Sequence, residues 1–203
     1  MSRTPFRVAL TFDAEHPDRP SDVGVHERIV DTLERHAIPA TFFVQGRWVQ
    51  AYPELARALP SQGHLVGSHS FYHVRMPLLS PAGLQNDVRQ AERAIRDIVR
   101  VDPKPWFRLP FGSGLSNRRV HAGLGDLGYR HIHWHADGRE WRKRLGETEV
   151  EDEIVSGVTE HGDGAIVLMH SWPRPIPAAL DGIIRRVGEA GGTFVRVDEL
   201  EKR

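Results

Sequence analysis

The chain lacks cysteine, an excess of charge of either sign and any long apolar run. The absence of cysteine excludes disulfides, cysteine-based zinc sites and a cysteine nucleophile. Because 27 Lys and Arg balance 27 Asp and Glu, we expect no nucleic-acid partner and no polybasic patch for a membrane surface. No apolar run approaches the roughly 20 residues of a membrane span. The N-terminus also lacks an apolar signal-peptide stretch, so we expect a cytoplasmic protein unless a leader has been removed.

The chain does contain enough apolar residues for a substantial core, 39% of a length of 203, and we expect one domain over residues 1–203. Short apolar or β-branched runs that end in Gly, Pro or polar residues predict strands at 7–12, 40–44, 64–68, 105–109, 129–134, 165–169 and 193–197. Apolar residues three or four positions apart predict helices at 25–33, 48–59, 81–99, 118–127, 148–159 and 176–189. This alternation favours a parallel α/β sheet, either closed into a barrel or left open and doubly wound.

Residues that can carry chemistry follow most of the predicted strands. They are Asp13, Glu15, His69, His73, Arg108, His135, Asp137, Glu140 and His170. In parallel barrels the catalytic groups collect at the carboxyl ends of the strands. Folding alone does not require such clustering, so the pattern predicts a functional site at one end of the sheet.

Two pairs among these residues are compatible with a metal site. His69 and His73 are four positions apart, so on a helical turn both imidazoles reach one ion. Asp13 and Glu15 are two apart, so in an extended segment they point the same way. Two imidazoles and one carboxylate leave a position on Zn²⁺ for water, whose proton a second carboxylate can take. The structural alternatives are half-exposed helix histidines, acids that solvate a loop and, for His170, a core-edge histidine bonded to the backbone.

Five short motifs, in this order and spacing, resemble those of polysaccharide deacetylases of the NodB-homology type (carbohydrate esterase family 4). They are Thr-Phe-Asp at 11–13, Ser-His-Ser-x-x-His at 68–73, Arg-x-Pro-Phe-Gly at 108–112, Trp-x-x-Asp-x-x-Glu-Trp at 134–141 and Leu-x-His at 168–170. The resemblance covers residues 7 to about 200. It implies that the α/β fold is a distorted (β/α)7 TIM-like barrel.

The resemblance also implies roles for the residues that match. His69 and His73 take the places of two metal-binding imidazoles, and Asp13 takes that of the catalytic base. Arg108 stands where the family has the residue that pairs with the base. His170 stands where the family has the general acid that protonates the departing amine.

Further matching positions concern the acetyl group of a substrate. The resemblance implies that the backbone N–H of Phe111 helps to hold the developing oxyanion. It also implies that Leu168 and Trp141 form the walls of a small pocket for the acetyl methyl. Glu140 stands where the family usually has an Asp that tunes the histidine equivalent to His170. A glutamate can do the same with one more methylene.

The first motif departs from the family pattern Thr-Phe-Asp-Asp-Gly, whose second Asp binds metal. Ala14 stands at that position and cannot bind an ion. Some relatives have Asp-x-Glu instead, so we expect Glu15 to be the third ligand, with His16 as the alternative ligand or a loop residue. One carboxylate and two imidazoles suit a single Zn²⁺, and Co²⁺, Ni²⁺, Mn²⁺ or Fe²⁺ can occupy such a site.

The resemblance implies a metal-dependent enzyme that removes acetate from an N-acetylated carbohydrate. The expected substrate is an N-acetylglucosamine-containing oligo- or polysaccharide of the chitooligosaccharide or peptidoglycan type. One alternative is hydrolysis of a non-sugar amide, such as a cyclic imide or ureide, because relatives with Asp-x-Glu act on these. The other is a catalytically inactive barrel that binds glycans, for which Ala14 is the only support.

Overall fold

The computed structural model describes residues 4–18, 24–142 and 145–201. Its strands are β1 (Phe6–Ala14), β2 (Thr41–Val44), β3 (Leu65–Ser68), β4 (Trp106–Phe107), β5 (Arg130–His131), β6 (Ala136–Asp137), β7 (Ala165–His170) and β8 (Gly192–Phe194). Its α-helices are α1 (Val25–Arg35), α2 (Gly46–Ala51), α3 (Pro53–Ser61), α4 (Pro81–Ala94), α5 (Arg118–Gly125), α6 (Glu147–His161), α7 (Ile176–Glu189) and α8 (Val197–Leu200). Shorter helical segments are η1 (Met76–Leu78), η2 (Ile95–Val99) and η3 (Pro110–Gly112).

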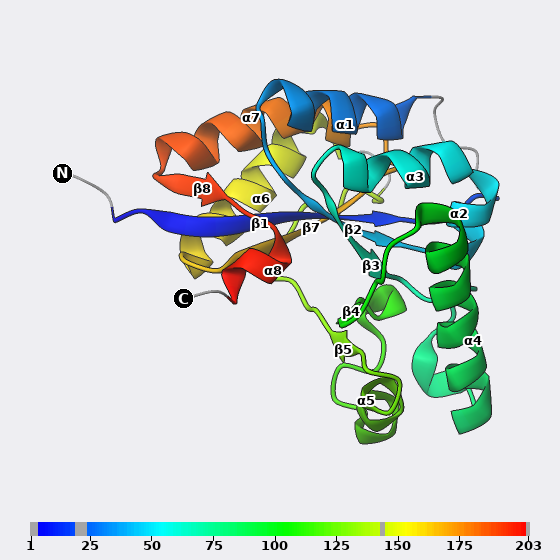
Figure 1. The fold of residues 1–203 in the computed structure, drawn as a ribbon. Helices are drawn as coiled ribbons and strands as arrows, with labels where there is room; N and C mark the ends of the chain where they lie inside the picture. The colour runs from blue at the N-terminus through cyan, green and yellow to red at the C-terminus, as the bar shows by residue number, and fades with distance from the viewer. Residues whose placement is uncertain (1–3, 19–23, 143–144, 202–203) are drawn as a thin grey trace.

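All strands belong to one parallel sheet in the order β5-β4-β3-β2-β1-β7-β6, with β8 paired to the start of β1. The sheet curls around its long central strand β1 (Figure 1), and the expected distorted (β/α)7 barrel is confirmed. Within the described ranges no ladder joins β5 to β6, so the barrel is open between them. Because the ladders are parallel, the carboxyl ends of the strands meet at one edge.

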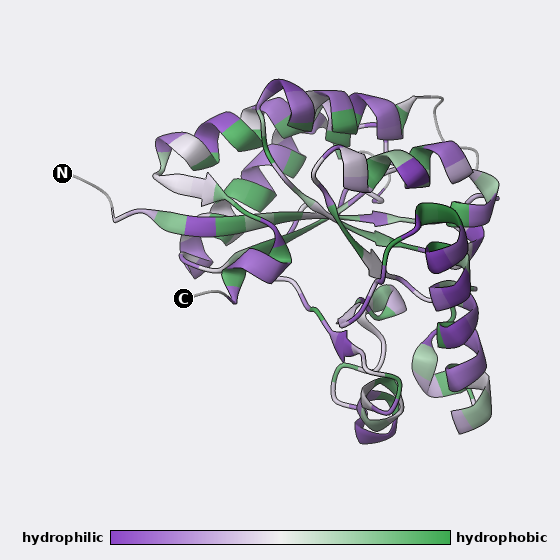
Figure 2. Cartoon of the chain, in the orientation of Figure 1, coloured by the Kyte–Doolittle hydropathy of each residue, from purple (hydrophilic) through white to green (hydrophobic). Residues whose placement is uncertain are grey.

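The core lies between β1, its neighbours and the surrounding helices. Residues 8–14 of β1 are all buried, as expected for a parallel strand covered on both faces. Figure 2 shows apolar strands through the centre of the molecule and polar residues on the outer faces of the helices. Helices α1 and α7 pack together over the sheet, and α6 packs against α7. This scaffold fixes the strand ends that carry the candidate site.

Two expected helices differ from those observed. The helix expected at 48–59 is two helices, because Pro53 begins α3 and disfavours helical conformation at Tyr52. The helix expected at 81–99 is α-helical only to Ala94 and continues as the π-helical segment η2. Among the described helices, none has both the length and the apolar character needed to cross a membrane.

The short strands also differ from expectation. The runs at 105–109 and 129–134 contain only the two-residue strands β4 and β5. The run at 193–197 overlaps β8, which begins at Gly192, but Val197 already begins α8. The short strand β6 was not expected at all. A two-residue strand is too short to show an alternating pattern, so periodicity cannot detect it.

Candidate functional site

Most of the residues expected to carry chemistry meet at the carboxyl edge of the sheet. In the ladders, Asp13 of β1 lies opposite Phe43 of β2 and His170 of β7. Ser68, the last residue of β3, lies opposite Phe107 of β4, so the loops after these strands leave the sheet at one level. The strand ends and loops enclose a cavity of about 370 Å³, whose lining includes Asp13, Glu15, His69, His73, Leu168 and His170.

His69 and His73 do not lie on a helix, so the expectation of a helical turn is wrong. Residues 69–75 form an irregular loop. Ser70 and His73 have left-handed backbone conformations, with φ of 65° and 57°. The imidazoles nevertheless converge, with ring centroids 4.8 Å apart. Non-glycine residues rarely adopt this conformation, and such strain is typical of functional sites.

Hydrogen bonds from outside and inside the loop hold this backbone. The buried carboxylate of Asp87, on α4, accepts the N–H groups of Phe71 and Tyr72, each at 3.0 Å. Ser70 Oγ accepts the N–H of His73 at 2.9 Å. The directions of the two histidines are therefore set by the fixed backbone between them.

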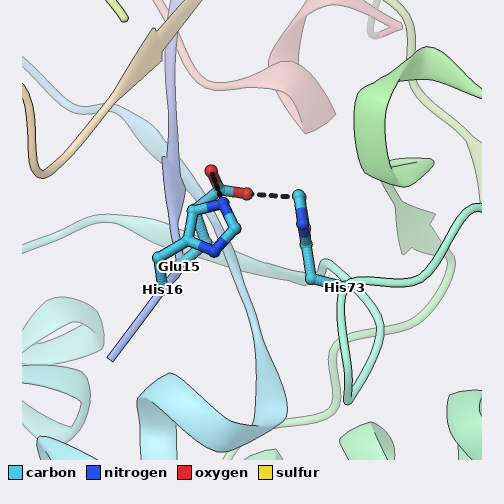
Figure 3. Close-up of side chains that lie close together, drawn as sticks. All are labelled: Glu15, His16 and His73. Atoms are coloured by element: carbon cyan, nitrogen blue, oxygen red, sulfur yellow. Dashed lines mark ion pairs between the residues drawn. The ribbon is translucent and has the colours of Figure 1, made fainter. Parts of the chain in front are cut away.

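Glu15 lies at the centre of a group of histidines, directly after β1. Its Oε2 lies 2.5 Å from His73 Nε2 and 3.1 Å from His69 Nε2, and its Oε1 lies 2.8 Å from His16 Nε2. Figure 3 shows the side chains of Glu15, His16 and His73 pointing toward one another. Although burial opposes the charged form, hydrogen bonds from the three histidines hold the pKa of Glu15 well below its usual range.

The chemistry of these donors fits a divalent metal. His69 Nδ1 donates to the Arg108 carbonyl at 3.0 Å, so in the neutral ring Nε2 turns a lone pair toward the Glu15 carboxylate. Two such acceptors at contact distance require a cation between them, either a proton or a metal ion. Burial disfavours protonation of His69, but the charges of Asp13 and Glu15 raise its pKa. Burial and the nearby imidazoles lower the pKa of His73, which favours the neutral form that binds metals.

Asp13 is held by the fully buried guanidinium of Arg108. Arg108 Nη1 donates to Asp13 Oδ1 at 3.0 Å and to Thr11 Oγ1 at 2.6 Å. The guanidinium carbon lies 4.1 Å from the ring centroid of Phe43 and 5.7 Å from that of Trp134. This packing fixes Asp13 Oδ1 and leaves Oδ2 3.5 Å from His69 Nε2. Burial lowers the pKa of Arg108, but its ordinary value is so high that it stays charged.

His170 and Glu140 form a second acid–histidine pair at the same cavity. His170 Nδ1 donates to Glu140 Oε1 at 2.8 Å, and the His170 backbone N–H donates to the same oxygen at 2.6 Å. Nε2 therefore faces the metal-binding group, 3.9 Å from Glu15 Oε1. Burial opposes protonation, but Glu140 above all, with Glu15 and Asp13, raises the pKa of His170 to about 9.

Phe111, Leu168 and Trp141 all line the cavity. Phe111 has a left-handed backbone (φ 58°, ψ 13°) and an exposed ring. Leu168 is buried on β7, whereas Trp141 is exposed at the rim and meets the His170 ring edge to face, with centroids 5.2 Å apart. Asp137 lines the cavity too, and burial raises its pKa.

The structure adds contacts to the site that sequence reasoning did not predict. Trp172 Nε1 donates to Glu15 Oε1 at 3.3 Å. Gln45 Oε1 accepts the N–H of His16 at 2.9 Å. Asp87 and Thr11 act on the site through the hydrogen bonds described above. The available signals were the position of Trp172, two residues after His170, and that of Thr11 in the Thr-Phe-Asp motif. Gln45 and Asp87 are common residue types with no distinctive spacing.

One predicted strand-end histidine does not join the site. His135 Nδ1 accepts the N–H of Ile166 at 3.0 Å. Its ring stacks on that of His161, with centroids 3.7 Å apart. His135 therefore contributes to packing beside β7 and is not among the residues that line the cavity.

Comparison with known proteins places this geometry in a family context. Residues 2–132 match the family model described as polysaccharide deacetylase. A peptidoglycan N-acetylglucosamine deacetylase of Listeria monocytogenes is 35% identical over 199 residues, which are 98% of this chain and 40% of that protein. This chain thus spans less than half the length of that relative. A chitooligosaccharide deacetylase of Bradyrhizobium is 33% identical over 168 residues, covering 83% of this chain and 72% of that protein.

The fold has solved counterparts as well. The crystal structure of a pseudoenzyme of carbohydrate esterase family 4 from Bacillus anthracis superposes with a TM-score of 0.83 at 28% identity. The match covers 98% of this chain and 66% of that one. The same architecture therefore occurs in a protein described as lacking the enzymatic activity of its family.

Proposed function

Because this chain belongs to the polysaccharide deacetylase family, we propose that it removes acetyl groups from an N-acetylated carbohydrate. The proposed substrate is an N-acetylglucosamine-containing oligo- or polysaccharide of the chitooligosaccharide or peptidoglycan type. Residues 1–203 act as one catalytic domain in this proposal. The observation that carries it is a single cavity lined by Asp13, Glu15, His69, His73 and His170.

The reaction is proposed to need one divalent metal, Zn²⁺ in the first instance, with Co²⁺, Ni²⁺, Mn²⁺ or Fe²⁺ as other candidates. Glu15, His69 and His73 would hold it, since His73 Nε2 and His69 Nε2 lie 2.5 and 3.1 Å from the same carboxylate oxygen, Glu15 Oε2. A bound metal of this kind supplies a Lewis acid for the amide carbonyl and makes a water more acidic.

The proton steps are assigned to two residues of the cavity, Asp13 of β1 and His170 of the neighbouring strand β7. Asp13, oriented by Arg108, takes a proton from the attacking water as the oxygen adds to the acetamide carbonyl carbon. His170 gives its Nε2 proton to the sugar nitrogen as the carbon–nitrogen bond breaks, which yields acetate and a free amine. Glu140 supports this step because it holds Nδ1 of His170 and raises the pKa of the ring.

Three further residues are proposed to bind the acetyl group. The backbone N–H of Phe111 donates to the developing oxyanion, a contribution that is typically about 10²–10³-fold in kcat. Leu168 and Trp141 enclose the acetyl methyl between an aliphatic and an aromatic wall. The exposed position of Trp141 lets it contact a sugar ring as well.

The test combines metal analysis with acetate release from chitooligosaccharides. We expect stoichiometric metal and metal-dependent acetate release. Metal without acetate release from chitooligosaccharides or peptidoglycan fragments would point to a non-sugar amide, such as a cyclic imide or ureide. Glycan binding with neither metal nor acetate release would instead indicate an inactive barrel. Ala14, which replaces a metal-binding residue of the family motif, would agree with that outcome. The Bacillus anthracis pseudoenzyme is a precedent for it.

A further inference from the structure

We propose that His16 is an additional protein ligand of the divalent metal, beside Glu15, His69 and His73. This inference rests on the metal site of the proposed function and deepens it. In the first motif, which reads Asp-Ala-Glu at 13–15, His16 comes directly after the proposed ligand Glu15. The site thereby gains a third imidazole, beside those of His69 and His73, which the three-ligand assignment does not include.

The first support is the position of the His16 donor atom. His16 Nε2 lies 2.8 Å from Glu15 Oε1. Ligand atoms of Glu15, His16 and His73 all lie within 4.8 Å of one another, and Figure 3 shows the Glu15 carboxylate between the His16 and His73 rings, with an ion pair to each. Two ligands of a tetrahedral Zn²⁺ at about 2.1 Å are about 3.4 Å apart, so these spacings suit one shared ion.

The second support is the way the backbone delivers this ring. His16 has a left-handed conformation, with φ of 59°, and its N–H donates to Gln45 Oε1 at 2.9 Å. Gln45 is itself buried, at 2% exposure, directly before α2. Two residues further on, Asp18 pairs with Arg47 of α2 at 2.9 Å. The loop is thus fixed at two points against the same helix, and the strained residue is the one whose imidazole reaches the site.

The third support is the distribution of donors around the carboxylate. His69 and His73 face Glu15 Oε2, whereas His16 faces Oε1. The His16 ring meets the His73 ring edge to face, with centroids 4.6 Å apart. A set of three imidazoles and one carboxylate favours Zn²⁺, Co²⁺, Ni²⁺ or Fe²⁺ over Mn²⁺. His16 would then be the fourth protein donor to the bound ion, beside the three of the proposed function.

The test measures metal binding rather than activity. The probes are Zn²⁺ alone, with chelator competition to give its affinity, and Co²⁺ alone, whose visible absorption reports coordination. His16→Asn removes the imidazole but tolerates the left-handed backbone, and His16→Gln retains a side-chain N–H that can reach Glu15. His36→Ala, which removes a surface histidine paired with Asp181, is the matched control, and circular dichroism checks the fold of each variant.

Loss of a hydrogen bond around a metal ligand typically weakens metal binding about 10–100-fold. We therefore expect both His16 variants to lose more than about 100-fold in Zn²⁺ affinity and to change the Co²⁺ spectrum, while His36→Ala changes neither. A smaller loss, or an unchanged Co²⁺ spectrum in a folded variant, overturns the assignment. If His16→Asn does not fold, His16→Gln decides alone.

Failure of this inference is distinguishable from failure of the proposed function. Metal-dependent acetate release by the unaltered protein, with normal Zn²⁺ affinity in the His16 variants, rejects only the fourth ligand. Absence of metal binding by the unaltered protein rejects the site on which both proposals depend.

Discussion

Two groups of largely buried histidines in this barrel lie in different electrostatic surroundings, those at the carboxyl edge beside carboxylates and those of the apolar core, His26 and His64, beside aromatic rings. At the carboxyl edge, His170 beside Glu140 has its pKa raised to about 9. Between the sheet and its helices, burial lowers the pKa values of His26 and His64 to about 4. Phe42 lies between these two rings, with centroids 5.6 and 5.1 Å away. Both groups are largely buried, so the Glu140 carboxylate, rather than burial, explains why His170 can carry a proton while His26 and His64 stay neutral.

The strongest way to test this comparison is to remove one histidine from each group. We expect His73→Ala to lose more than about 100-fold in metal affinity, because a ligand is removed, and to lose acetate release with it. We expect His26→Leu to retain both. Metal content by elemental analysis and acetate assays measure the two variants, and full activity with stoichiometric metal in His73→Ala would remove it from the site.

A second change separates proton transfer from metal binding within the carboxyl-edge group. His170→Ala removes the proposed general acid, and we expect kcat to fall about 10²–10⁴-fold. Metal content should stay at the level of the unaltered protein, since His170 is not a proposed ligand. Steady-state kinetics and elemental analysis on the same sample test this. Loss of metal in step with loss of activity would contradict the division of roles.

The lowered pKa of His26 leads to a prediction of how stability depends on pH. Folded His26 stays neutral down to about pH 4, whereas the unfolded chain takes up this proton below about pH 6.5. The free energy of unfolding therefore decreases as pH falls from about 6.5 to 4, by about 3 kcal/mol for this residue alone. We expect His26→Leu to flatten this part of the profile. Chemical denaturation at a series of pH values measures it, and an unchanged slope would show that His26 titrates normally.

The smallest expected effect is a displacement of the pH–activity profile. Because His170 must be protonated to act as the acid, activity is lost as pH rises through its pKa. Glu140→Gln removes the carboxylate that raises this pKa, so the alkaline limb of kcat should move to lower pH. Glu140→Asp keeps the charge and is the matched control. An alkaline limb that does not move in the Gln variant would assign it to another group.

Much of the site was predictable because short motifs sit directly at strand ends. Asp13 follows an apolar run long enough to identify β1, and His170 ends the equally clear β7. Parallel strands bring such ends together, so their meeting at one cavity follows from topology. Glu15 was predictable from spacing, because it is two residues after Asp13 and reaches the same His69 nitrogen.

Other parts depend on contacts that leave no periodic pattern. The backbone around Ser70 is set by hydrogen bonds rather than by helical spacing, so the four-residue interval between the histidines led to the wrong local structure. Gln45 is joined to His16 across 29 positions of sequence. His135 has the composition of a site residue, yet a stacking partner and a backbone hydrogen bond occupy it.

The attachment of Asp87 to the loop has a consequence for how substrate preference can change. Its carboxylate accepts the main-chain N–H groups of Phe71 and Tyr72, so it holds the path of the loop whatever side chain stands at position 72. Tyr72 is 52% exposed. Substitution at this surface position, in evolution or redesign, can therefore alter which substrate groups contact the loop. The directions of the His69 and His73 imidazoles would stay unchanged.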